Sequence, residues 1–275
     1  MIDHNSLLYW YPEISDVFLT PKTYYITPKD VYEWMRNGVP DEWIEKIDHN
    51  LIGRYPVFFR TDHSSNKHEW NKSCVVHNKN EINSRIINTL DFNYMEDLWP
   101  TALVFRELLK PYGGKNHADF GGFNAFDGFP VGRELRFFFM DGKVECVHRY
   151  WLHELFVTDS WAVSTVPKDW EKRWKKLYDI PSDEIAGITR QIEKDFPAVL
   201  RTENWSVDWM YAKGKDTEYR WYLIDMALAD RSFHPEHSSD LISPGGESVV
   251  EKGNVPKQEN SGLKPEDFTL LGDDK

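Results

Sequence analysis

Residues 134–151 read Glu-Leu-Arg-Phe-Phe-Phe-Met-Asp-Gly-Lys-Val-Glu-Cys-Val-His-Arg-Tyr-Trp, and this stretch decides the fold. The Asp141-Gly142 pair separates two runs of aromatic and β-branched residues, so we predict a hairpin with a two-residue primed turn. Because alternate side chains of a strand share a face, Glu134 and Arg136 point the same way, and the return strand can bring a cation near them. A buried salt bridge is the structural alternative for this pattern.

The rest of the chain mixes strands and helices. Runs of aromatic and β-branched residues predict further strands at 55–60, 101–107, 143–151, 205–211 and 219–226. Start signals and periodicity predict helices from Thr27 through Trp34, from Pro40 onward, and over 81–90, 168–178 and 185–200. The Gly-rich, aromatic stretch from Pro111 to Arg133 has no periodicity, so we expect a functional lid or a disordered loop. The fold class is therefore α+β.

Composition excludes several classes of protein. The 275 residues include 12 Trp, 13 Tyr and 16 Phe, which suits one large domain or two lobes around a cleft with aromatic cores. A net charge of −12 disfavours nucleic-acid binding, and no apolar run approaches the roughly 20 residues of a membrane span. With two cysteines and no visible secretory leader, we expect a cytoplasmic protein of a reducing compartment. The acidic segment 236–275, whose one aromatic is Phe268, is expected to be a flexible tail.

A first candidate site follows the apolar strand Pro56-Val57-Phe58-Phe59. Arg60 ends this strand, and a loop of small polar residues leads to Lys67. Two cations and several backbone N–H groups at one strand end suit the oxygens of a polyphosphate, although a solvated loop is the plainer interpretation. Neither a Walker A sequence nor a dinucleotide glycine fingerprint is present, so any phosphate site lacks those loops.

Two carboxylates form a second candidate site. Asp208 and Asp225 each lie in a strand rich in apolar residues, where a carboxylate is costly to bury without a cation or a metal. Carboxylates from adjacent antiparallel strands suit Mg²⁺, which takes few protein oxygens and keeps its other positions for phosphate and water.

A zinc site is the competing metal hypothesis. The residues in question are His63, His68, Cys74 and His77. Their spacing matches no common zinc module, and Lys67 lies between two of them, so we rank this hypothesis last. Cys74 and Cys146 are interpreted as small apolar core residues.

The order of these pieces resembles the ATP-grasp superfamily over roughly residues 51–234. In chain order the pieces are Arg60 and Lys67, Arg106-Glu107-Leu108-Leu109, Glu134-Leu135-Arg136, Asp208, and Ile224-Asp225-Met226-Ala227. The resemblance is to a phage and microbial branch, and to the eukaryotic cell-division-cycle ATP-grasp proteins that help assemble a translation initiation factor.

This resemblance implies an ATP site in a cleft between two lobes. The residues implied to bind the nucleotide are Arg60, Lys67, Arg106, Glu107, Leu108 and Arg136. Of these, Arg60, Lys67 and Arg136 would contact phosphates, and the segment from Arg106 would line the adenine pocket with backbone groups. Lys67 and Arg136 would also be the catalytic residues.

The resemblance further implies that Asp208 and Asp225 bind Mg²⁺. The chain departs from the family pattern at Ala227, where an Asn usually supplies a further metal ligand. Asp230 or Ser232 could replace it. Without a replacement, metal affinity falls and the chain could bind ATP without turning it over.

The resemblance predicts an ATP- and magnesium-dependent ligase that activates a small-molecule or peptide carboxylate as an acyl phosphate for attack by an amine. The alternative is an ATP-binding assembly factor that acts on a protein partner. We predict a lead-in segment at 1–50, a first lobe at 51–110, and a second lobe at 111–235 that includes the Gly-rich loop 111–133. The acidic tail occupies 236–275.

Overall fold

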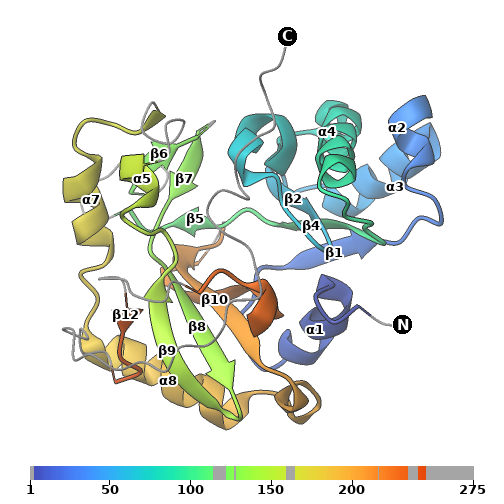
Figure 1. Ribbon diagram of the computed structural model, residues 1–275. Coiled ribbons are helices and arrows are strands. Elements are labelled where there is room, and N and C mark those ends of the chain that lie inside the picture. The colour runs from blue at the N-terminus through green and yellow to red at the C-terminus, as the bar shows by residue number, and fades with distance from the viewer. Residues whose placement is uncertain are drawn as a thin grey trace.

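The computed structural model describes residues 3–113, 122–126, 128–158, 165–215, 217–234 and 241–245. Two antiparallel sheets, each with its own hydrophobic core, lie side by side and are joined by the chain between β4 (Leu103–Glu107) and β5 (Lys110–Pro111) (Figure 1). We call them the small lobe and the large lobe. This mixture of helices and antiparallel sheet confirms the predicted α+β class.

The small lobe is a four-stranded sheet covered on one face by helices. The strands, in spatial order, are β1 (Thr23–Ile26), β4, β2 (Val57–Thr61) and β3 (Val75–Val76). The helices are α2 (Glu33–Asn37), α3 (Asp41–Leu51) and α4 (Ile82–Met95), with short turns η1 (Lys67–Glu69), η2 (Trp70–Cys74) and η3 (Lys79–Glu81). Val57 and Phe59 of β2 are buried in the core beneath these helices, so Phe58 and Arg60 project from the opposite face.

The large lobe contains the larger sheet. Its strands, in spatial order, are β11 (Arg220–Leu228), β10 (Trp205–Lys213), β8 (Glu134–Met140), β9 (Lys143–Arg149) and β12 (Leu241–Ile242), and β5 also pairs with β10. A small hairpin joins β6 (Phe123–Ala125) to β7 (Phe129–Val131). The helical segments are α1 (Leu7–Ile14), α5 (Leu155–Thr158), α7 (Trp170–Leu177), α8 (Ser182–Asp195), η4 (Ala198–Thr202) and η5 (Ala229–Arg231).

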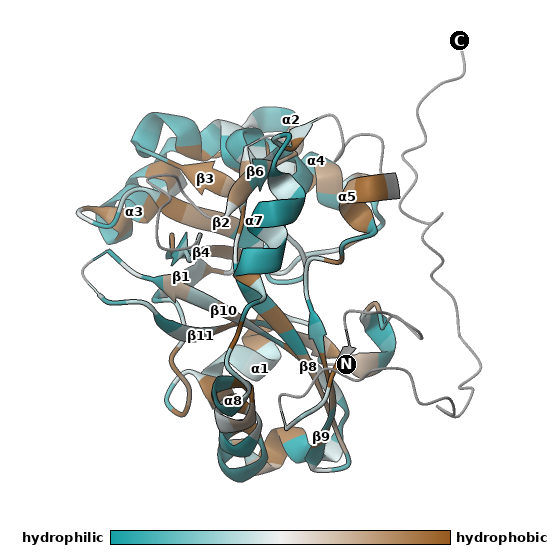
Figure 2. Cartoon of the chain, turned by 90° about the vertical axis from the view of Figure 1, so that its left-hand side faces the viewer, coloured by the Kyte–Doolittle hydropathy of each residue, from teal (hydrophilic) through white to brown (hydrophobic). Residues whose placement is uncertain are grey.

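Hydropathy follows this layering. The strand β3 and the first three residues of β2 are apolar, whereas α7 is mostly polar (Figure 2). Helix α8 packs under β8 and β9 and buries Ile185, Ile188 and Ile192, the apolar face that its sequence spacing predicts. No helix in the described part of the chain is both long and apolar enough to cross a membrane.

The hairpin prediction is confirmed. Strands β8 and β9 pair antiparallel, and Asp141 and Gly142 both have positive φ, at 49° and 81°. Two successive positive φ angles are what a type I′ turn requires, which explains the Asp-Gly pair.

Other expectations need correction. The helix expected from Thr27 begins only at Glu33, whose N–H donates to the Asp30 carboxylate before it. Helix α1 was not predicted. It begins at Leu7 after the N-cap Ser6, whose hydroxyl accepts from the Leu8 N–H, and it contains Pro12, a residue type that usually disrupts a helix interior.

The structure describes parts of two segments that were expected to be a lid or loop and a tail. The stretch 111–133 contains the β6–β7 hairpin, while residues 114–121 and 127 lie outside the described residues. In the predicted tail, Leu241–Ile242 pairs with β9 because Ile242 is buried in the large core; residues 236–240 and 246–275 lie outside the described residues.

The predicted lead-in, 1–50, is shared between the lobes, with α1 in the large core and β1 in the small sheet. The predicted domain boundaries themselves stay predictions.

Candidate functional site

A cavity of about 70 Å³ lies between the two sheets. The small lobe contributes Phe58, Arg60 and Arg106 to its wall, and the large lobe contributes Met210 and Ile224. This volume is well below the roughly 300–1,000 Å³ of pockets that hold drug-sized ligands. A nucleotide would therefore need the lobes, or the side chains between them, to move apart.

Arg60 crosses from the small lobe to the large lobe. Arg60 belongs to β2 and projects toward the cleft. Its Nη1 lies 2.8 Å from Oδ2 of Asp225 on β11. Burial alone would raise the pKa of Asp225, but Arg60 and Lys67 outweigh burial and lower it. The Asp225 carboxylate is therefore held in its charged form by cations of the opposite lobe.

Lys67 makes the second crossing. It begins the turn η1, and its Nζ lies 3.1 Å from the Tyr150 hydroxyl and 4.7 Å from the centre of that ring. Burial would lower the pKa of Lys67, but Tyr150, Glu134 and Asp225 raise it above the usual lysine value. The ammonium group therefore stays charged, although it is half-buried.

The large sheet aligns Arg136, Asp208 and Asp225 across three adjacent strands. Asp208 on β10 lies directly opposite Arg136 on β8 on one side and Asp225 on β11 on the other. The Arg136 guanidinium donates through Nε and Nη2 to the two oxygens of Asp208, at 2.8 and 2.9 Å. We expected a salt bridge within the β8–β9 hairpin. The bidentate partner of Arg136 instead comes from β10, the strand on the other side of β8.

Glu134 is the site residue that we did not nominate. It is 1% exposed, its Oε2 accepts from the Trp151 indole N–H at 3.0 Å, and its Oε1 has no hydrogen-bond partner among the described residues. Burial raises the pKa of Glu134 to about 7, against the opposing effect of Lys67. The sequence offered one indication of its role: Glu134 and Arg136 are alternate residues of β8, so both side chains face the cleft.

The chain crosses between the lobes at Arg106, Glu107 and Leu108. The Arg106 guanidinium donates to the Ile224 carbonyl through Nη1, while its Nη2 finds no acceptor among the described residues. Burial and the nearby Arg60 lower the pKa of Arg106 to about 10.

Glu107 connects three segments at this crossing. Its carboxylate accepts from the backbone N–H groups of Lys22 and Lys215, at 3.5 and 3.1 Å. Leu108 lines the cavity beside it. The predicted nucleotide-binding residues Arg106, Glu107 and Leu108 thus form one wall of the cavity, and Glu107 ties that wall to both lobes.

The position of Ala227 has a hydroxyl neighbour. Ala227 lies opposite Ser206 of β10, and the Ser206 hydroxyl is hydrogen-bonded to that of Ser232. Asp230 is exposed in η5. Of the two replacements considered for the family's Asn, Ser232 is therefore the one with a contact at this strand position.

The zinc ligands considered first do not gather. His63 contacts Asp3 and Asp62, and the Cys74 thiol donates to the Asn66 carbonyl. Within the described ranges, neither residue belongs to a group of three or more ligands.

The charged cluster fits a magnesium–polyphosphate group. It offers the cations Arg60, Lys67 and Arg136 together with two carboxylates on facing strand positions. The orphaned Nη2 of Arg106 and Oε1 of Glu134 are buried polar atoms that need a partner, and a bound ligand or ion can supply one.

Comparison with solved structures finds proteins of similar fold. Cdc123 from Schizosaccharomyces pombe is 15% identical, with a TM-score of 0.45, over 82% of this chain and 83% of that chain. D-alanyl-alanine synthetase A from Vibrio cholerae is 10% identical, with a TM-score of 0.44, over 82% of this chain and 55% of that one. The ATP-grasp ligase PsnB, complexed with precursor peptide PsnA2 and AMPPNP, is 10% identical, with a TM-score of 0.40, over 81% and 50%.

Each of these similarities has a TM-score below 0.5, so none of them decides the family or the function of this chain. The chain spans about half the length of the two ligases. No family model and no curated protein matches the chain. At such identities and TM-scores the similarity concerns the fold alone, so the roles of the cleft residues rest on their geometry.

Proposed function

We propose that the cleft binds ATP with Mg²⁺ and that the chain uses it as a carboxylate–amine ligase. The supporting observation is the convergence of Arg60, Lys67 and Arg136 with Asp208 and Asp225 in one buried cluster beside the cavity. Burying so many charged groups together is costly. A magnesium–phosphate ligand would contact the cations through its phosphate oxygens and the carboxylates through its metal ion.

Each lobe supplies part of the proposed site. Lys67 and Arg60 come from the small lobe and Arg136 from the large lobe, so phosphate oxygens held by all three would bridge the cleft. Leu108, at the crossing between the lobes, offers backbone groups and apolar surface to the adenine. When bound, Mg²⁺ would be held by Asp208 and Asp225 and would neutralise charge on the phosphates.

The proposed reaction follows from positioning and charge. A substrate carboxylate oxygen attacks the γ-phosphorus, ADP leaves, and an acyl phosphate forms. The amine then attacks the acyl carbon, giving an amide, inorganic phosphate and a released proton. Lys67 and Arg136 stabilise the charge that develops during phosphoryl transfer, because they are fixed donors in a site with little water.

One assay tests the proposal. The protein is incubated with ATP and Mg²⁺, with and without pooled amino acids or short peptides, and ADP release is measured. Release that requires an acceptor, and that falls at least about tenfold in Lys67→Met, supports the ligase. Tight ATP binding with no ADP release from any acceptor contradicts it.

A second candidate function rests on Ala227. This residue offers no ligand atom, and its neighbour Ser232 is already engaged with Ser206. A site that binds ATP without turning it over would suit an assembly factor that recognises a protein partner. In the same assay this candidate predicts saturable ATP binding, no acceptor-dependent ADP release, and capture of a protein partner that requires ATP.

A further inference from the structure

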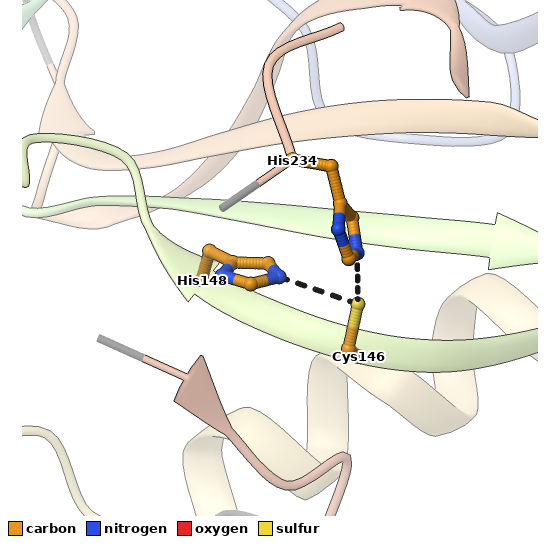
Figure 3. A group of neighbouring side chains, drawn as sticks. All are labelled: Cys146, His148 and His234. Atoms are coloured by element: carbon orange, nitrogen blue, oxygen red, sulfur yellow. Dashed lines mark hydrogen bonds between the residues drawn. The ribbon is translucent and has the colours of Figure 1, made fainter. Parts of the chain in front are cut away.

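Cys146, His148 and His234 form a cluster of potential metal ligands on the large lobe (Figure 3). Cys146 and His148 lie two residues apart on β9, so their side chains share a face of the sheet. His234 reaches the same point from the segment that follows η5. The ligand atoms of these three side chains all lie within 4.8 Å of one another.

The distances in the cluster suit a shared ion. The Cys146 sulfur lies 3.4 Å from Nε2 of His148 and 3.2 Å from Nε2 of His234. A tetrahedral zinc with bonds of about 2.3 Å to sulfur and about 2.0–2.1 Å to nitrogen places these atoms roughly 3.5 Å apart. The sulfur and both nitrogens therefore need only small shifts to reach one ion, and the exposed His234 has room to make them.

The surroundings hold the ligands in place. The Phe138 ring packs edge-on against His148 and His234, with ring centres 5.6 and 4.3 Å away. His148 is itself only 2% exposed, so its ring is held between these neighbours.

Arg136 is the charge that opposes a cation here. It lies opposite His148 in the sheet register. Its guanidinium is held by both oxygens of Asp208, so its charge is compensated within the large lobe. A metal at the cluster thus meets a neutralised ion pair rather than an isolated cation.

We propose that Cys146, His148 and His234 bind a Zn²⁺ ion, with solvent in the fourth position. Thiolate and imidazole ligands favour zinc, whereas Mg²⁺ prefers the oxygens found in the nucleotide cleft. The two sites therefore select different metals, although both lie on the same sheet. The ion would fasten the segment that carries His234 onto β9.

The test uses the full chain, freed of metal by a chelator and titrated with Co²⁺ and then with Zn²⁺ in excess Mg²⁺. We expect one Co²⁺ per chain, a thiolate-to-cobalt charge-transfer band, and loss of that band when Zn²⁺ displaces Co²⁺. Cys146→Ser should abolish the band. His234→Ala should weaken Zn²⁺ binding by at least about 100-fold, because losing even an outer-shell partner costs about 10–100-fold.

The double variant Cys74→Ser, His77→Ala is the matched control, because it removes the other thiol and an exposed histidine while leaving the cluster intact. It should bind Co²⁺ and Zn²⁺ like the parent. Circular dichroism confirms folding, which Cys146→Ser and His234→Ala should preserve, the first being nearly isosteric and the second exposed. Absence of the band in the parent, its persistence in Cys146→Ser, or its loss in the control overturns the proposal.

Discussion

Two arginine–aspartate pairs lie in the same cleft and are built differently. Arg136 and Asp208 belong to adjacent strands of one sheet, share two hydrogen bonds, and are 18% and 5% exposed. Arg60 and Asp225 belong to different lobes and share one contact, and Asp225 is 26% exposed. The comparison indicates that the first pair is held more firmly, whereas the second can exchange its single contact for a ligand more easily.

The largest effect is expected from Asp208→Asn. The amide offers one oxygen where the bidentate pair needs two, and its NH₂ group faces a guanidinium donor, so a buried cation loses its partner. We expect a loss of about 3–5 kcal/mol in the free energy of unfolding, measured by urea denaturation. Adding Arg136→Met should recover part of this loss, because it removes the stranded charge. A single variant as stable as the parent would show that the within-sheet pair is not structural.

Glu134 extends the comparison to a buried carboxylate with no arginine partner. Its pKa of about 7 exceeds the ordinary 4.5, so between these pH values the folded chain holds a proton that the unfolded chain releases. The contribution of Glu134 to the free energy of unfolding is therefore fully present below pH 4.5 and is lost as the pH rises through 7. The loss is on the order of 3 kcal/mol. Glu134→Gln should remove this slope when unfolding is measured from pH 4.5 to 8. Parallel curves for parent and variant would contradict it.

A smaller effect on stability, and a larger one on binding, is expected from Asp225→Asn. Arg60 contacts one oxygen of this residue and the second accepts from the Met226 N–H, so the amide oxygen can keep the cross-lobe contact at the cost of the backbone one. We expect a loss of about 1–2 kcal/mol in stability. ATP affinity should lose its dependence on Mg²⁺.

An ATP titration with and without Mg²⁺, run where the Asp225→Asn variant is folded, separates the two roles. A variant that melts much earlier yet binds magnesium–ATP like the parent would make Asp225 a structural residue, and would weaken the metal assignment of Asp208 with it.

The smallest effect on stability is expected from Lys67→Met. The methionine keeps the apolar stem against Tyr150 and removes only the charge, so the free energy of unfolding should change by less than about 1 kcal/mol. ATP affinity should fall at least about tenfold. Lys72→Met is the control, since Lys72 is 63% exposed and pairs only with Glu69 among the contacts described, so it should change neither quantity. Equal ATP affinity in the two variants would remove Lys67 from the site.

Local chemistry made part of this structure predictable. The Asp141-Gly142 turn and the alternation around it determine a hairpin within a few residues, and the antiparallel partners of Asp208 and Asp225 follow once the strands are recognised. Short helices and strands were harder to predict from the sequence. The strand β1 has four residues, and helix α1 contains Pro12, so neither carries a signal strong enough to stand without its tertiary contacts.

Long-range contacts account for the rest. Glu134 is distinctive because of the atoms that surround it, which come from η1 and from the end of the hairpin. The Cys146–His148 pair was visible as alternate residues, but its partner His234 lies 86 positions further on. No spacing rule connects them, because the chain passes through the helices α5, α7 and α8 and the strands β10 and β11 in between.

The counter-ion arrangement also has a consequence for binding kinetics. In this structure Asp225 neutralises Arg60 and the Tyr150 hydroxyl contacts Lys67, so two of the three proposed phosphate contacts begin as contacts between the lobes. A nucleotide must exchange these contacts rather than fill a vacant pocket. Its observed association rate should therefore level off at high nucleotide concentration, at the rate at which the lobes part, and the measured affinity is reduced by the fraction of molecules that are closed.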